Sequence, residues 1–185
     1  MSVERSYVLQ EAILGTRAPS EIKGVLELVD LPYYTFRGSV QIGQLVVHKV
    51  LVNEVRDIFK NLCRERFPIE KMVPIVAYEW DDERSMADNN TSAFNYRTIA
   101  GTSRLSNHSF GLALDINPAF NPYLSRSGIV SPPGALYVPS RPGTVTKGGI
   151  VERLFAAHGW SWGGDWEDRK DWQHFEKSLE MGSSA

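Results

Sequence analysis

The chain has 185 residues and a mass of 20.8 kDa. Its residues are 42% hydrophobic and 23% charged, a composition typical of a globular protein, and the chain is long enough for one domain but too short for two. Twenty Lys and Arg residues nearly balance 22 Asp and Glu residues, and the net charge of −2 argues against a nucleic-acid-binding protein, which would be basic. The single cysteine excludes an internal disulfide and a cysteine-rich zinc cluster, so a metal site would need carboxylates and some of the four histidines.

The two ends of the chain carry no recognisable targeting or membrane signal. No segment reaches the roughly 18 consecutive apolar residues of a membrane helix. The first 21 residues carry charges through their first apolar stretch, unlike a signal peptide. We therefore expect a protein made in the cytoplasm, which would act at a cell wall or in a periplasm only after export or release. We expect the small polar residues 181–185 to be disordered.

The first half of the sequence predicts strands followed by a helix. Residues 25–36 and 40–47 are rich in β-branched and aromatic side chains, which predicts two strands. From residue 51 to 67 apolar residues recur at spacings of three and four, which predicts one amphipathic helix ended by Pro68. Residues 72–80 predict another strand, and residues 81–92 a polar loop.

The second half contains a marked change in composition. The segment 111–116 is short, apolar and ends in an acid, as a buried strand would. Residues 117–149 hold six of the ten prolines and five of the fifteen glycines, which predicts a long loop that is functional or disordered. A helix is expected at 150–158, followed by a tryptophan-rich end. We predict an α+β fold in one domain spanning residues 1–185.

Two histidines and two acids form a candidate catalytic set. His108 and Asp115 are seven residues, or about 10 Å of helix, apart, so they converge only if Gly111 lets the chain reverse between them. With His174 they make a set that suits catalytic zinc and leaves a position open for water. Asp171 adds the carboxylate that metal-assisted hydrolysis needs. On spacing alone, the alternative is that both histidines are ordinary polar residues and that Asp115 caps a turn.

Two motifs in this region match those of a known family. Residues 106–115 match Ser-x-His-x-x-Gly-x-Ala-x-Asp at every specified position. Asp171 lies three residues before His174, and the aromatic Phe175 follows. The chain thereby resembles the zinc D-Ala-D-Ala carboxypeptidase and dipeptidase family, which includes vancomycin-resistance peptidases and phage L-alanyl-D-glutamate endolysins. The resemblance covers about residues 70–178, including Trp162-Gly163-Gly164 before the second motif.

The resemblance implies a role for each residue of the motifs. It implies one zinc ion on the face of a central antiparallel sheet flanked by helices, with three ligands: His108, Asp115 and His174. Asp171 would be the general base, although some members of the family have Glu there, which reaches one methylene further. Arg97 would steady the scissile carbonyl or the substrate carboxylate. Ser106 would lie beside the metal and hydrogen-bond the substrate.

Several neighbouring residues compete for these roles. Arg104 is also close to His108 in sequence, but Arg97 is favoured because Phe-Asn-Tyr-Arg resembles the family's context, the alternative being a structural salt bridge. Trp162 and Trp172 are expected to floor a substrate groove, or else to pack in the core. Glu176 is expected to be a surface acid rather than an acceptor beside a ligand histidine.

The resemblance implies a peptidase that acts on peptidoglycan stem peptides at a bond involving a D-amino acid. We expect a monomer that acts as a D-alanyl-D-alanine carboxypeptidase, with residues 117–149 as one wall of the cleft. An L-alanyl-D-glutamate endopeptidase, a wall-peptide-binding relative without activity, and a metal-dependent amidase for another substrate remain as alternatives. The acid at position 171 argues against the binding protein, because a protein that only binds could lose it.

Overall fold

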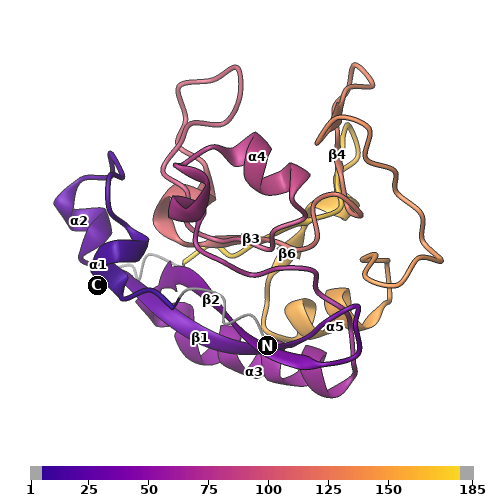
Figure 1. Ribbon diagram of the computed structural model, residues 1–185. Coiled ribbons are helices and arrows are strands. Elements are labelled where there is room, and N and C mark those ends of the chain that lie inside the picture. Colours follow the sequence, from indigo (N-terminus) through magenta and orange to yellow (C-terminus); the bar gives the residue numbers. More distant parts are fainter. Residues whose placement is uncertain (1–5, 180–185) are drawn as a thin grey trace, which may run out of the picture.

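The computed structural model describes residues 6–179 as an α+β fold with small antiparallel sheets (Figure 1). The predicted disorder of residues 181–185 lies outside the described residues. The helices are α1 (Leu9–Ala12), α2 (Ser20–Lys23), α3 (Val52–Arg64), α4 (Asp82–Ala87) and α5 (Ile150–Ala157). Short 3-10 turns are η1 (Lys49–Leu51), η2 (Ile75–Tyr78), η3 (Asn107–Phe110) and η4 (Gly163–Asp165). The strands are β1 (Leu26–Tyr34), β2 (Val40–His48), β3 (Ala113–Asp115), β4 (Tyr123–Leu124), β5 (Val130–Ser131), β6 (Ser161–Trp162), β7 (Lys170–Asp171) and β8 (His174–Glu176).

The β1–β2 hairpin and α3 form the base of the molecule. The hairpin pairs in register from Leu26 opposite His48 to Tyr34 opposite Val40. The apolar face of α3 is fully buried and packs with β1 in the main core. These elements confirm the two predicted strands and the predicted amphipathic helix, which ends at Arg64, before the expected end at Phe67. Among residues 6–179, the structure has no helix with the length and apolar content that a membrane crossing requires.

The central sheet has the strand order β3–β8–β6 and separates apolar from polar chemistry. Leu114 lies opposite Phe175, and both side chains are completely buried in the main core. The next pair in the ladder is Asp115 opposite His174. Because successive side chains of a strand point to opposite faces, this pair lies on the face away from the core. In Figure 1, α3 and α5 lie on one side of this sheet and α4 lies on the other.

The predictions for residues 72–92 were wrong in two places. The expected strand at 72–80 is instead the turn η2, which follows Pro74 and ends where Glu79 and Trp80 adopt positive φ angles of 58° and 67°. These angles are incompatible with an extended strand. The expected loop that follows contains α4, which begins because the Asp81 carboxylate accepts a hydrogen bond of 3.0 Å from the Arg84 backbone N–H.

The long loop 117–149 is confirmed, and two buried asparagines tie its ends together. The Asn121 carboxamide donates to the carbonyl oxygens of Ile116 and Gly143 at 2.9 and 3.1 Å and accepts from the Val145 N–H at 2.7 Å. The Asn117 carboxamide also donates to the Gly143 carbonyl, at 3.0 Å. Between these ends the chain forms the strands β4 and β5, and β4 also pairs with β7. The loop is therefore an ordered part of the fold.

Replacing Asn121 with alanine should destabilise the protein by about 3 kcal/mol, because it leaves several buried backbone groups without hydrogen bonds. Chemical denaturation would measure this loss, and limited proteolysis should show faster cleavage within residues 122–142. The control is Asn61→Ala, because the Asn61 side chain bonds only the Asp57 carbonyl on the exposed surface of α3. Equal stability of the two variants would contradict the anchoring role of Asn121.

Candidate metal centre and active site

Three buried side chains from different elements converge on one point. Each carboxylate oxygen of Asp115 contacts one histidine: Oδ2 lies 3.2 Å from His108 Nε2, and Oδ1 lies 3.0 Å from His174 Nδ1. The two histidine nitrogens are 3.1 Å apart. One ligand atom from each residue lies within 4.8 Å of the others, so these residues could hold a metal ion. The structure thus brings together the three residues that the motifs predicted.

The turn η3 places His108 beside Asp115. It begins where Ser106 Oγ accepts a hydrogen bond of 3.3 Å from the His108 N–H, and it ends at Gly111, whose φ is +66°. A Cβ atom at Gly111 would lie 2.5 Å from the backbone nitrogen of His48, so both the backbone angle and the close approach require glycine. The predicted chain reversal at Gly111 is confirmed. In this structure the Ser106 hydroxyl caps the turn.

Hydrogen bonds on the outer ring nitrogens orient both histidines. His108 Nδ1 lies 2.5 Å from the Ala93 carbonyl oxygen, to which it donates, so that its Nε2 lone pair faces the cluster. His174 Nε2 lies 3.2 Å from Glu176 Oε2, which leaves Nδ1 facing the cluster. Glu176 is therefore an acceptor for His174, and the expectation of a simple surface acid was wrong.

The electrostatics of the cluster favour a cation between its members. Burial raises the pKa of Asp115, but the two histidines outweigh it and hold that pKa well below its usual range. Burial lowers the pKa of His174, but hydrogen bonds to Asp115 and Glu176 outweigh it and raise the pKa to about 10. In the absence of a metal the ionised carboxylate is balanced by a proton on His174, and a metal ion bound by the same atoms would replace that proton.

Asp171 and Arg97 lie beside the cluster with polar atoms that lack partners. Asp171 Oδ1 and Arg97 Nε are buried and have no hydrogen bond to the described residues. Burial, assisted by Asp115 and Asp82, raises the pKa of Asp171 to about 7 against the opposing effects of His174 and Arg97. Unpartnered buried polar groups are uncommon in folded proteins. A pKa near neutrality suits a group that accepts and returns a proton.

Asp82 holds Arg97 in place, and the sequence did not reveal it. Its Oδ2 lies 3.0 Å from Arg97 Nη2, while its Oδ1 accepts a hydrogen bond of 3.1 Å from Asn95. Residues 81–92 were predicted as a loop, so the position of Asp82 in the first turn of α4 was not foreseen. The available signal was Asp81, a good helix N-cap residue. Arg97 therefore forms the structural salt bridge that was the alternative to a role in substrate binding. This salt bridge leaves the Arg97 Nε without a hydrogen-bond partner among the described residues. Arg104 is exposed.

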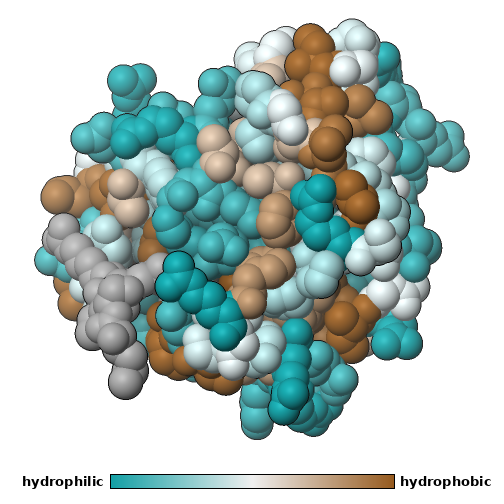
Figure 2. Space-filling model, turned by 45° about the vertical axis from the view of Figure 1, so that its right-hand side comes forward, coloured by the Kyte–Doolittle hydropathy of each residue, from teal (hydrophilic) through white to brown (hydrophobic). Residues whose placement is uncertain are grey.

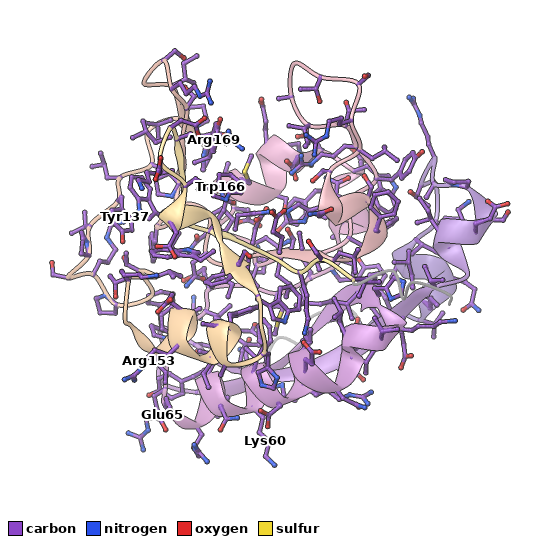
Figure 3. All side chains as sticks on the ribbon, turned by 180° about the vertical axis from the view of Figure 1, so that it is seen from behind. Lys60, Glu65, Tyr137, Arg153, Trp166 and Arg169 are labelled. Carbon is purple, nitrogen blue, oxygen red and sulfur yellow. The ribbon has the colours of Figure 1, made fainter. Side chains whose placement is uncertain are left out.

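The predicted groove tryptophans have different surroundings. Trp162 is 6% exposed, packs in the main core and donates its indole N–H to the Trp172 carbonyl at 2.9 Å, and it also lines a cavity beside the site. Trp172 is half-buried and stacks on Tyr137 of the long loop, with ring centroids 4.0 Å apart. The stack joins loop 117–149 to the residue after Asp171. Figure 3 shows Tyr137 on the same flank of the molecule as Trp166 and Arg169.

The surface on the side of the long loop is mixed in polarity. Figure 2 brings this side forward and shows hydrophilic side chains in the middle of the face, bordered at the upper right by hydrophobic ones. Two apolar residues of the loop, Ile129 and Leu136, are each 67% exposed. A cavity of about 530 Å³ lies next to the site, and its lining residues include Glu152 of α5, Trp162 of β6, Glu176 of β8 and Trp166.

Comparison with known proteins gives one match. A model of a family described as D-alanyl-D-alanine carboxypeptidase matches residues 100–177. The matched segment includes His108, Asp115, Asp171 and His174 and excludes Arg97 and α4. No curated protein and no solved structure matches the chain significantly. Residues 100–177, less than half of the chain, are therefore similar to the D-alanyl-D-alanine carboxypeptidase family, in agreement with the resemblance that the two motifs indicate.

Proposed function

We propose that this protein is a zinc-dependent D-alanyl-D-alanine carboxypeptidase, which hydrolyses a peptide bond next to a D-amino acid in peptidoglycan stem peptides. One observation carries the proposal: Asp171 Oδ1 and Arg97 Nε are buried without partners beside a His–Asp–His cluster. A protein that only binds peptide has no need of an unpaired buried carboxylate, which costs stability. A hydrolase needs such a group for water and substrate.

The donor set fits zinc. Two imidazole nitrogens and one carboxylate oxygen are common ligands of catalytic zinc, and three protein ligands leave a position for water or substrate. His108, Asp115 and His174 would hold the ion. When bound, zinc supplies Lewis acidity that polarises a carbonyl group and makes water nucleophilic near neutral pH.

The protein's own residues would carry the proton and stabilise the charge. Asp171 takes a proton from the attacking water while the water oxygen forms a bond to the carbonyl carbon. When the C–N bond breaks, Asp171 returns this proton to the leaving amine. Arg97 donates its free Nε–H to the developing oxyanion or to the substrate carboxylate. Asp82, through its ion pair with Nη2, keeps the guanidinium in this orientation.

Loop 117–149 would form one wall of the cleft and influence which bond is cut. The Tyr137–Trp172 stack and the pairing of β4 with β7 support this placement, because both join the loop to the segment that carries Asp171. A wall that closes one end of the cleft would favour removal of a terminal D-alanine. A cleft open at both ends would admit the internal L-alanyl-D-glutamate bond.

Incubation with purified peptidoglycan and with a stem pentapeptide should test the activity. We expect release of free D-alanine from the pentapeptide, and loss of this release after treatment with a chelator, because the metal is required for the chemistry. Mass spectrometry of the products would distinguish the two bonds. Cleavage between L-alanine and D-glutamate would replace the carboxypeptidase assignment, whereas activity that resists the chelator would contradict the zinc mechanism.

Asp171→Ala and His174→Ala should separate catalysis from metal binding. Asp171→Ala should lower kcat by at least about 100-fold, because the general base is lost, and should still bind one zinc ion. His174→Ala should lose the metal as well. Metal analysis after gel filtration, together with kinetics, would measure both effects. Undiminished activity of Asp171→Ala would refute its assignment as the base.

Asp171→Asn should stabilise the metal-free protein, and this effect should grow with pH. The folded-state pKa of about 7 is above the usual value, so the folded protein binds the extra proton and loses stability as the pH rises towards 7. The neutral asparagine avoids this loss. We expect Asp171→Asn to raise the Tm more at pH 8 than at pH 5. Each kcal/mol gained in the free energy of unfolding should raise the Tm by about 2–4 °C. The control is Glu167→Gln, which changes an exposed carboxylate in the neighbouring segment.

A further inference from the structure

One carboxylate oxygen of Glu176 accepts hydrogen bonds from residues of both motifs. Its Oε2 lies 3.2 Å from His174 Nε2 and accepts a second hydrogen bond, of 2.7 Å, from the Asn107 side-chain amide. Asn107 precedes His108 in the first motif, and Glu176 follows His174 by two residues in the second. The site described above leaves this carboxylate outside the ligand set and outside the proton-transfer steps.

The backbone explains why Glu176 reaches His174. Residues i and i+2 of a strand share a face, so both side chains point away from the core side of β8. On the neighbouring strand, Ala113 lies directly opposite Glu176. The small alanine leaves room for the longer carboxylate side chain to lie along the sheet. Asn107 in the turn η3 then approaches the same oxygen from the other motif.

The hydrogen bond has a defined chemical consequence for His174. An imidazole can offer a metal only the nitrogen that carries no proton, and a carboxylate on the other nitrogen selects that form. Glu176 can only accept when ionised, so it keeps the proton of His174 on Nε2. The amide of Asn107 can only donate to this oxygen, which prevents Glu176 from turning away.

We propose that Glu176, held by Asn107, is a positioning residue that fixes the ring orientation and the tautomer of His174 and thereby strengthens metal binding at Nδ1. This inference rests on the proposed function, because it takes the cluster to be a metal site. It assigns Glu176 no contact with substrate. It also links the two motifs directly, so that the turn carrying His108 and the strand carrying His174 are set by one hydrogen-bonded group.

Zinc titration of the chelator-stripped protein, in competition with a chromogenic chelator, tests the proposal without measuring activity. Removing such a carboxylate partner costs about 10- to 100-fold in metal affinity. We expect Glu176→Leu to weaken zinc binding by this factor and Glu176→Gln to weaken it less, because the glutamine oxygen still accepts from Nε2. The matched control is Glu152→Gln, since Glu152 lines the same cavity but bonds Lys147 and the Gly148 backbone.

A second measurement follows the ring itself. Nitrogen-15 NMR of the zinc-loaded protein reports which nitrogen of His174 carries the proton. We expect a single form protonated at Nε2 in the wild type and a shifted or exchanging signal in Glu176→Leu. Should that variant fail to fold, as judged by circular dichroism, Asn107→Leu leaves Glu176 and His174 in place and should weaken zinc binding by a smaller factor.

The possible outcomes separate this inference from the proposed function. If the wild type binds zinc and folded Glu176→Leu binds it equally well, the positioning role alone is overturned. Where Glu176→Leu does not fold, equal zinc binding by Asn107→Leu has the same meaning. A wild type that binds no zinc at all overturns the proposed function, and the positioning role with it. Weakening in the order leucine then glutamine, with an unchanged control, supports the proposal.

Discussion

The site depends on the register between β3 and β8. These strands pair Leu114 with Phe175 and Asp115 with His174, so one step along the ladder changes from completely buried hydrocarbon to buried charge. A shift by one residue would turn the charged pair into the core and the apolar pair towards the polar face, at a large cost in free energy. The hydrophobic pair therefore secures the position of Asp115 and His174, two members of the candidate metal site. Short strands suffice because the core holds the register.

The same arrangement explains why the site is expensive in stability. The costly member is Asp171, because burial outweighs the opposite charges of His174 and Arg97 and raises its pKa to about 7, whereas the interactions of Asp115 and His174 with their partners outweigh the effect of burial. The protein places the largest hydrophobic cluster on the other side of the sheet, where α3 and α5 pack against it. A well-packed base can support an adjacent site whose groups favour chemistry over stability.

The sequence predicted the regular elements and the convergence of His108, Asp115 and His174 for identifiable reasons. Strands β1 and β2 and helices α3 and α5 have clear periodicity, and the cluster follows from two motifs with fixed spacing. Residues 72–92 were predicted poorly because Glu79 and Trp80 adopt left-handed backbone angles that no side-chain pattern indicates. Asp82 was missed because residues 81–92 were predicted as a loop, although Asp81 is a good helix N-cap residue. Glu176 was misjudged because its partner Asn107 is 69 residues away, and only the fold brings the two together.

The placement of Asp171 connects the proposed general base to loop 117–149. Asp171 lies in β7, opposite Tyr123 of β4, and the next residue, Trp172, stacks on Tyr137. Both partners belong to loop 117–149, whose ends are closed by Asn117 and Asn121. Under the proposed function, the loop that would line the cleft and the carboxylate that would move the proton are therefore parts of one packed unit. A substitution that disturbs the packing of Tyr123 or Tyr137 would also act on the segment of Asp171, whereas Asp115 and His174 are held by the pairing of β3 with β8.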